Sequence, residues 1–373
     1  MTTTSIPVSK AFRSKELAKK VVGKINEIMP EDDLIKVCHV CGTHEYVISR
    51  HGLRSLLPKN LEVIAGPGCP VCVTPSHDID EAILLANNGK VICTYGDMMV
   101  VPATQESLSK VKAKGADVKV VYSPTDAVKF AKKNPDKEVI FFSLGFETTA
   151  PATVAEILNK PPENFSVLTS HRLIPPAMEL LMGIGDIHID GFLCPGHVAT
   201  IIGVKPFKVF ADAYAMPAVV AGFEPDDVLL SLFMMVRQIY EGKPRAENEY
   251  TRCVSFEGNL RAQEFLEEVF DVVDAHWRGI GKVPYSGYAL KKEYEEYDAR
   301  KRFESLLEKV GESRDIHPGC SCHNVMLGKI KPTECKLFMK ACTPQSPYGP
   351  CMVSMEGTCA IYARYGKQMK TEL

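Results

Sequence analysis

The sequence predicts an α/β protein with two Rossmann-like α/β domains that contain parallel sheets, and a mainly helical and irregular third domain. Between residues 61 and 221, short β-branched runs alternate with longer amphipathic stretches, as in α/β layers. After residue 222 the hydrophobic period becomes that of helices. From Asp315 to Met355 the chain is rich in Pro, Gly and Cys and has little periodicity, so this segment needs another source of order.

Seven short apolar runs are expected to be strands of the parallel sheets. They are Leu61–Ala65, Lys90–Thr94, Val118–Tyr122, Glu138–Ser143, Ser166–Ser170, Asp190–Leu193 and Pro217–Ala221. Leu34–Val40 is a further short apolar run that leads into a predicted helix. Amphipathic stretches between the strands predict helices at Ile79–Asn87, Gln105–Lys114 and Thr125–Lys133.

Three longer helices are expected in the second half of the chain, at Asp226–Tyr240, Leu260–Ala275 and Leu290–Lys309. The charged residues of the second and third are typical of solvated helix faces. The expected domains are therefore a first α/β domain over 45–123, a second over 124–222, and a helical and cysteine-rich domain from 1–44 and 223–373.

Composition and charge exclude several classes of function. A net charge of −2 does not indicate the positively charged surface that binds nucleic acid or an anionic membrane. No apolar run is long enough to span a bilayer, and Met1–Pro30 contains no secretory signal, so a cytoplasmic location is expected. In a reducing compartment, clustered cysteines indicate metal binding or redox chemistry rather than structural disulfides. No glycine-rich phosphate loop is present.

The C-terminal cysteines have the spacing of a metal cluster. Cys320, Cys335, Cys342 and Cys359 are separated by 14, 6 and 16 residues. Four thiolates can hold a [4Fe–4S] cluster, and the ligands need only converge in space. Zinc is less favoured because its structural sites usually contain close cysteine pairs, and unliganded thiols are the third possibility. Cys322 and Cys351 lie nearby, and either could replace one of the four.

The N-terminal cysteines lie on two predicted strand-to-helix turns. Cys69 and Cys72 have the spacing of a redox dithiol or a metal half-site, and they directly follow the strand Leu61–Ala65. Cys41 follows the apolar run Leu34–Val40 and precedes His44 and Glu45, which could move protons at a metal or a thiol. Strand ends of this kind form the sites of open α/β sheets.

Two weaker signals occupy equivalent places after other strands. Glu147, within Gly-Phe-Glu-Thr-Thr-Ala-Pro (145–151), could offer a carboxylate to the same cleft. A capped helix start at Thr148 or Thr149 explains this segment at least as well. Asp97 follows the strand Lys90–Thr94 and could be only a turn residue.

Five segments together resemble the HypD family of [NiFe]-hydrogenase maturation factors. They are Cys-Gly-Thr-His-Glu (41–45), Gly-Pro-Gly-Cys-Pro-Val-Cys (66–72), Tyr-Gly-Asp-Met-Met (95–99), Gly-Phe-Glu-Thr-Thr-Ala-Pro (145–151) and Cys-Pro-Gly-His-Val (194–198). The C-terminal cysteines and Gly-Pro-Cys-Met-Val-Ser-Met-Glu-Gly-Thr-Cys (349–359) are similar to the cluster region of the same family. The resemblance covers most of the chain.

The resemblance implies a scaffold on which the Fe(CN)2CO unit of the hydrogenase is assembled. Cys41 would bind the iron with a cysteine of the chaperone HypC, assisted locally by His44 and Glu45. Cys69 and Cys72 would be a redox dithiol or further iron-site thiols. Cys320, Cys335, Cys342 and Cys359 would hold a [4Fe–4S] cluster that supplies electrons.

The expected partners also follow from the resemblance: HypC, the cyanide donor HypE, and indirectly HypF and the hydrogenase large subunit. Whether the protein is itself an enzyme stays open. The alternatives are an iron–sulfur reductase acting on a protein disulfide, which leaves Cys41 without a role, and a zinc-stabilised interaction protein.

Overall fold

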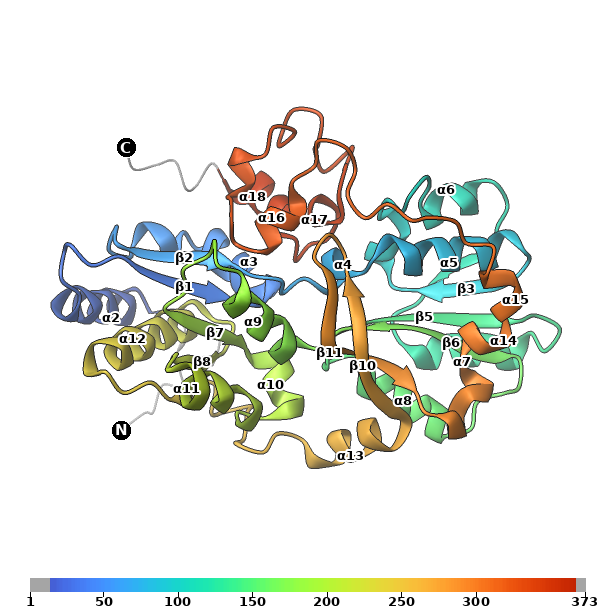
Figure 1. The fold of residues 1–373 in the computed structure, drawn as a ribbon, viewed down its shortest axis with the longest axis horizontal. Coiled ribbons are helices and arrows are strands. Elements are labelled where there is room, and N and C mark those ends of the chain that lie inside the picture. The colour runs from blue at the N-terminus through green and yellow to red at the C-terminus, as the bar shows by residue number, and fades with distance from the viewer. Residues whose placement is uncertain (1–13, 367–373) are drawn as a thin grey trace, which may run out of the picture.

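Two parallel sheets lie beside each other, and a cysteine-rich C-terminal region covers the junction between them (Figure 1). The computed structural model describes residues 14–366. The predicted α/β class is confirmed, because both sheets contain only parallel strand pairs.

The first sheet, sheet A, has the strand order β2-β1-β7-β8-β9. Its strands are β1 (Ile35–His39), β2 (Leu61–Ala65), β7 (Gly191–Pro195), β8 (Ala218–Ala221) and β9 (Ala246–Asn248). Its helices are α2 (Lys15–Ile28), α3 (Gly42–Arg50), α10 (Gly196–Ile202), α11 (Lys208–Tyr214) and α12 (Pro225–Glu241), with the short 3-10 helices η1 (Leu53–Ser55) and η3 (Lys205–Phe207).

The second sheet, sheet B, has the strand order β4-β3-β5-β6. Its strands are β3 (Val91–Thr94), β4 (Val118–Val120), β5 (Val139–Gly145) and β6 (Phe165–His171). The helices of this part are α4 (Pro70–Val73), α5 (Ser76–Asn87), η2 (Gly96–Val100), α6 (Leu108–Ala113), α7 (Pro124–Lys133), α8 (Ala150–Leu158) and α9 (Ile174–Gly183).

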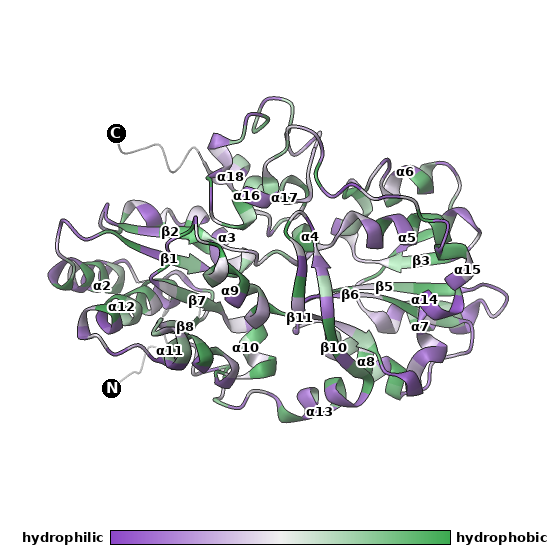
Figure 2. Ribbon diagram, viewed as in Figure 1, coloured by the Kyte–Doolittle hydropathy of each residue, from purple (hydrophilic) through white to green (hydrophobic). Residues whose placement is uncertain are grey.

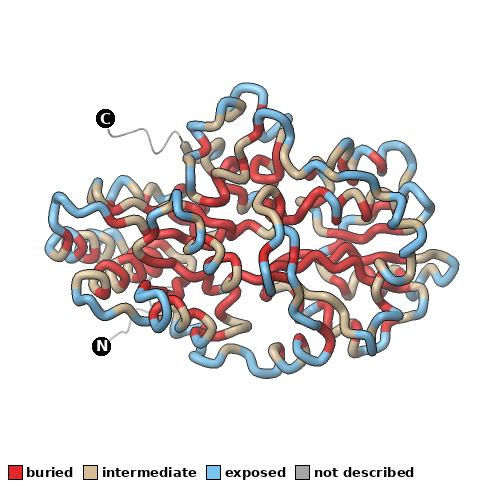
Figure 3. The backbone as a smooth tube through the Cα atoms, in the orientation of Figure 1, coloured by how far each residue is buried: buried red, intermediate tan, exposed pale blue. Residues whose placement is uncertain are grey.

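The strands of both sheets form the core because helices cover them on both faces. Every residue of β5 and of β6 is buried, which explains why these runs are almost continuously apolar rather than alternating. Figure 3 shows the buried chain concentrated in the strands, and Figure 2 shows hydrophilic residues on the outer helices. One apolar cluster contains residues of both sheets and of the C-terminal region, so the halves share a core.

Sheet B is an insertion within sheet A. Strands β1 and β2 come before it in the chain, whereas β7, β8 and β9 come after it. Each sheet therefore takes strands from more than one of the expected ranges 1–44, 45–123, 124–222 and 223–373. Those domain boundaries stay a prediction, and their residues 1–13 and 367–373 lie outside the described part of the chain.

A twisted antiparallel hairpin was missed by the sequence analysis. It consists of β10 (Phe270–Trp277) and β11 (Gly281–Leu290) and follows α13 (Leu260–Val269). The expected helix Leu260–Ala275 is therefore wrong beyond Val269, where β-branched Val272 and Val273 favour a strand. Figure 1 shows this hairpin between the two sheets.

The expected helix Leu290–Lys309 is replaced by three short turns of helix. These are η4 (Lys292–Tyr297), α14 (Ala299–Arg302) and α15 (Glu304–Leu307). The side chain of Asp298 caps the second of them by accepting from the amide of Arg300, which starts a new helix inside the predicted one.

The C-terminal region contains short helices joined by irregular chain. These are α16 (Cys322–Met326), η5 (Pro332–Glu334), α17 (Pro350–Val353) and α18 (Thr358–Tyr365). Helix α18 packs against α3, and α17 packs against α4, so this region rests on the first turns of the chain after β1 and β2. Within residues 14–366, no helix has the length and apolar character needed to cross a membrane.

Candidate functional site

Cys41 lies at the carboxyl end of β1, at the start of α3. It is the N-cap residue of this helix and is 6% exposed. Burial and the nearby Glu356 carboxylate raise the pKa of the Cys41 thiol to about 12, although the amides of His44 and Thr43 act in the opposite direction. Without a bound cation this thiol is therefore protonated at neutral pH.

Cys69 and Cys72 lie at the carboxyl end of the neighbouring strand β2. Cys69 caps the short helix α4, whose first residue is Pro70, and its sulfur accepts from the amide of Cys72. The two cysteines form a disulfide in this structure. Pro70 suits this position because the first residue of a helix has no partner for its amide.

The two turns touch through their backbones. The amide of Gly42 donates to the carbonyl of Gly68 over 3.0 Å. A Cβ at Gly68 would overlap the backbone of Val40 and Cys41, so only glycine allows this approach. Because β1 and β2 pair in parallel, with His39 opposite Ala65, their ends bring the Cys41 turn and the disulfide together.

Glu45 lies in a buried ion pair. Arg54 donates two hydrogen bonds to its carboxylate, at 2.7 and 2.8 Å, and His39 lies 2.8 Å from it. Burial raises the pKa of the carboxyl group, but the charge of Arg54 and these hydrogen bonds outweigh it and hold the pKa far below its usual range. Glu45 is therefore a permanent carboxylate that joins α3 to η1.

His44 is buried beside the carboxyl end of β8. Its Nε2 lies 3.0 Å from the carbonyl of Gly222 and 3.3 Å from that of Ala221, and its ring stacks on Phe223. Burial lowers the pKa of His44 to about 3, so the ring is neutral. Since carbonyls only accept, Nε2 carries the proton, and Nδ1, which has no partner, is a bare acceptor.

The C-terminal cysteines converge on one small cavity. It is lined by Cys320, Cys322, Cys335, Cys342, Cys351 and Cys359, with Leu337, Phe338, Gly349 and Met352. All four cysteines expected to hold a cluster are among them, together with Cys322 and Cys351. Cys38, whose role the sequence also left open, lies in β1 and does not line this cavity. A hydrogen bond with Cys322 lowers the pKa of Cys320 to about 6.

The lining of this cavity fits an iron–sulfur cluster in its donor chemistry. A Cβ at Gly349 would lie 2.9 Å from the sulfur of Cys320 and 3.2 Å from that of Cys322, so glycine leaves this space open. As the side chains stand, no group of three or more His, Cys, Asp or Glu within residues 14–366 has the arrangement of a metal site. The six thiols share one cavity without preformed coordination geometry.

Glu356 connects this region to the Cys41 turn, and the sequence analysis missed it. The hydroxyl of Thr43 donates to its carboxylate over 2.9 Å, and Gly42 lies directly against its backbone. Next to it, Asp97 accepts from Ser354 and from the amide of Met355. Asp97 is therefore more than a turn residue. The position of Glu356, three residues before Cys359, was the available signal.

Glu147 is not exposed to a cleft. It is 2% exposed, and one carboxylate oxygen accepts from the amide of Ile174 at the start of α9 over 3.0 Å. Burial raises its pKa to about 7. Thr149, at the start of α8, donates to the carbonyl of Leu144. Thr149 is the N-cap residue of α8, but its side chain makes no capping hydrogen bond, so the capping explanation of this segment is not confirmed.

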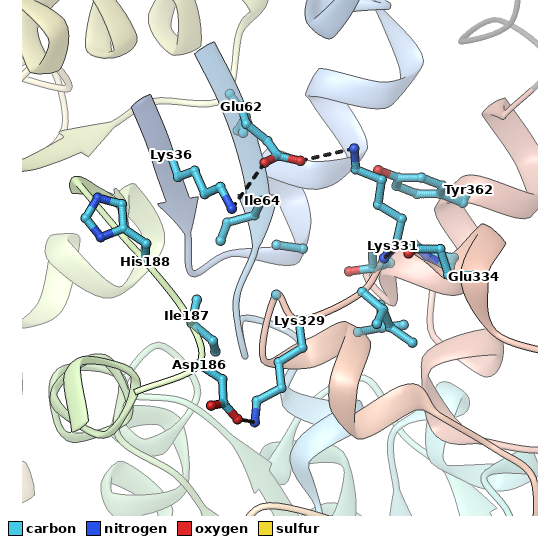
Figure 4. Close-up of a pocket in the computed structure, with 17 residues that line it drawn as sticks. Lys36, Glu62, Ile64, Asp186, Ile187, His188, Lys329, Lys331, Glu334 and Tyr362 are labelled. Carbon is cyan, nitrogen blue, oxygen red and sulfur yellow. Dashed lines mark hydrogen bonds and ion pairs between the residues drawn. The ribbon is translucent and has the colours of Figure 1, made fainter. Parts of the chain in front are cut away.

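The polar pocket in Figure 4 lies away from the thiols, between β1, β2 and the C-terminal region. Its charged side chains are already paired: Glu62 with Lys36 at 3.7 Å and Lys331 at 3.1 Å, and Asp186 with Lys329 at 3.4 Å. Lys331 thereby joins the C-terminal region to β2, and Lys329 joins it to the segment before β7. We assign the pocket no chemistry.

Comparison with known proteins identifies the family. The model of the HypD family, described as "Hydrogenase formation hypA family", matches residues 16–366. The chain belongs to the HypD family. It is 46% identical over 358 residues to a putative hydrogenase expression/formation protein of Methanocaldococcus jannaschii, covering 95% of this chain and 98% of that protein.

Named HypD proteins show the same similarity. The hydrogenase maturation factor HypD2 of Bradyrhizobium diazoefficiens is 46% identical over 368 residues, covering 95% of this chain and 96% of its own. HypD of Cupriavidus necator is 41% identical over 368 residues, with the same coverage of both chains. Membership of the HypD family thus covers both sheets and the cysteine-rich region.

Proposed function

We propose that this protein is a hydrogenase maturation factor that holds iron while the Fe(CN)2CO unit of a [NiFe] hydrogenase is assembled, with the iron as its substrate. The observation that carries the proposal is the contact between the two thiol-bearing turns at the carboxyl ends of β1 and β2. Carboxyl ends of parallel strands are the usual place for a site in such sheets. Family membership and the names of the relatives support the same function.

Cys41 binds the iron in this proposal. Soft thiolates suit iron that carries cyanide and carbon monoxide. Because the pKa of the Cys41 thiol is raised to about 12, the iron must displace its proton on binding. His44 follows Cys41 by three residues in the first turn of α3, and its unpaired Nδ1 can accept a hydrogen bond. This supports the expected assisting role of His44 beside the iron ligand. Glu45 contributes by holding α3 in place rather than by moving protons.

Cys69 and Cys72 act as a redox pair in this proposal. Their disulfide becomes two thiols when it takes up two electrons and two protons, next to the iron ligand. Cys320, Cys335, Cys342 and Cys359 would hold a [4Fe–4S] cluster, which supplies single electrons when bound. Cys322 and Cys351 line the same cavity and remain available as free thiols.

The partners are proposed from the family alone. HypC would share the iron through a cysteine of its own, and HypE would deliver cyanide made with HypF before the iron unit passes to the hydrogenase large subunit. Cys41 is 6% exposed, so only a small part of its side chain is open to a partner.

Infrared spectroscopy of the complex purified with its partners tests this function. Cys41→Ala should abolish the bands of iron-bound cyanide and carbon monoxide, because the thiolate ligand is lost. Cys253→Ala, which removes an exposed cysteine, should leave them unchanged. Full-intensity bands in the Cys41→Ala protein would contradict the assignment.

A thiol–disulfide reductase is the second candidate, favoured by the disulfide beside the cysteine-lined region. It requires Cys69 and Cys72 but not Cys41. Reduction of a protein disulfide that survives Cys41→Ala and is lost in Cys72→Ala would favour this activity over iron assembly.

A further inference from the structure

Arg278 lies on the turn of the β10–β11 hairpin, where the hairpin meets the cysteine-rich region. The following residue, Gly279, has a φ of +68°, which favours glycine. A Cβ there would lie 2.6 Å from Ile316 and 2.8 Å from the Cβ of His323, which follows Cys322 in α16. Figure 1 shows the tip of this hairpin close to α4. The turn is therefore pressed between the two thiol-bearing regions.

The side chain of Arg278 is buried with one donor unused. It is 2% exposed. Its Nε donates to the carbonyl of Asp315 over 2.8 Å and its Nη2 to that of Pro102 over 2.7 Å, while its amide donates to the carbonyl of Val73. Nη1 is buried and has no partner. Neither acceptor of the guanidinium carries a charge.

A buried guanidinium with an unused donor lowers the stability of a folded protein unless an anion pairs with it. An unsatisfied buried donor costs about 1–3 kcal/mol, and a buried charge without compensation costs several kcal/mol. The carboxylate of Asp315 is engaged elsewhere, with the amides of Ser76 and Gly279 and with His276. A buried unpaired donor in a native protein calls for a partner such as a water, an ion or a ligand.

The cysteine cavity lies beside this turn, because Gly279 packs against His323 and the preceding residue, Cys322, lines the cavity. Burial lowers the pKa of Arg278, and negative charge on Cys322, Asp315, Cys320 and Asp80 acts in the opposite direction, with Cys322 the largest contributor. None of the residues that line the cavity is cationic. Arg278 is thus a buried cation next to a set of thiols that would carry net negative charge as thiolates or with a bound cluster.

We propose that Arg278 is a positioning residue for the sulfur site, where its guanidinium balances negative charge and its free Nη1 donates a hydrogen bond to sulfur at Cys320 or Cys322. Where that sulfur belongs to a bound cluster, the inference rests on the proposed function. Hydrogen bonds to sulfur and nearby positive charge favour the reduced, more negative state of a cluster. Arg278 therefore sets the reduction potential of the site, and its backbone ties that site to the residue after Cys72.

The first test is a redox titration of the cluster, monitored by electron paramagnetic resonance in anaerobically purified full-length protein. Arg278→Gln should make reduction about tenfold less favourable, which is about 59 mV for one electron. Arg278→Lys keeps the charge without the planar fork and should give a smaller shift in the same direction. Lys282→Gln, on the same hairpin with a side chain 72% exposed, should leave the potential unchanged.

The second test uses cluster-free protein and does not depend on the proposed function. Alkylation of Cys320 by iodoacetamide, followed by mass spectrometry, should be several-fold slower in folded Arg278→Gln than in wild type, because the positive charge and hydrogen-bond donor proposed for this sulfur site are lost. Circular dichroism identifies the folded variants, and Arg278→Lys replaces Arg278→Gln if the latter does not fold. A folded variant at 278 with wild-type potential or wild-type alkylation overturns the inference. If the wild-type protein assembles no cluster, the proposed function is contradicted. The alkylation result then tests the role of Arg278 by itself.

Discussion

Glu45 illustrates how a local motif misleads at the scale of single residues. Its place beside His44 and close to Cys41 predicted a proton carrier, yet its carboxylate is held by Arg54, His39 and Ser49. The spacing of residues along the chain does not show which groups a helix side chain will contact after the following segment folds back onto the helix. Arg54, nine residues further along the chain, keeps Glu45 ionised because it brings a cation to the buried carboxylate.

Removing that cation should destabilise the protein strongly. Arg54→Met leaves Glu45 as a buried charge without its partner, and a loss of about 3–5 kcal/mol in the free energy of unfolding is expected. Urea denaturation followed by circular dichroism measures it. Arg50→Met removes an exposed arginine of α3, the helix that contains Glu45, and should change the free energy of unfolding by less than about 1 kcal/mol. Equal effects of the two substitutions would show that the Glu45 ion pair is not structural.

At the scale of elements, the site is formed by two strand-to-helix turns that share one contact surface. The sequence placed both turns correctly, since β2 matches the predicted Leu61–Ala65 and β1 lies within the apolar run Leu34–Val40. It did not reveal that β1 is an interior strand of sheet A, with β2 on one side and β7 on the other. Pairing of β1 with a strand about 150 residues later is a non-local choice that local periodicity does not encode.

Gly68→Ala should separate the two turns. The added Cβ would overlap the backbone of Val40 and Cys41, and overpacking of this kind costs about 1–3 kcal/mol. We expect a lower Tm and, in the complex with partners, weaker infrared bands of the iron-bound ligands. Gly23→Ala is the matched control: its Cβ meets nothing within 4 Å on helix α2, and it should stabilise the protein slightly. A Gly68→Ala protein with wild-type Tm and bands would argue against close contact of the turns.

At the scale of the whole molecule, one buried apolar cluster joins both sheets, the hairpin and the cysteine-rich region. The buried cluster that contains Cys38 of sheet A also contains Ile92 of sheet B, Trp277 of the hairpin and Cys351 of the C-terminal region. Trp277 stacks on Phe146 at the end of β5 and donates to Ser286 over 2.8 Å. A shared core of this kind favours cooperative unfolding.

Trp277 is the single tryptophan of the chain and reports directly on this cooperativity. The midpoint of urea unfolding followed by its fluorescence should coincide with the midpoint followed by far-ultraviolet circular dichroism. The reason is that the hairpin cannot unfold without exposing the buried residues that it shares with both sheets. Two separate midpoints would show that the sheets unfold independently.

The sequence anticipated the parallel α/β class and every strand of sheet B, because buried β-branched runs are distinctive. It missed the β10–β11 hairpin, because the helical period predicted for Leu260–Ala275 was extended past Val269, where the helix ends. It also missed Arg278 and Glu356, because each acquires its partners only through contacts between distant segments.

The insertion of sheet B within sheet A has a consequence for the order of synthesis. As the nascent chain leaves the ribosome, β1 and β2 emerge first with Cys41, Cys69 and Cys72, whereas β7, the other neighbour of β1, follows only after all of sheet B. Folding that proceeds along with synthesis can complete sheet B first. The thiols that meet at the mature site are thus made long before the sheet that buries them is closed, and during that interval they are open to the cell's thiols, oxidants and metal ions.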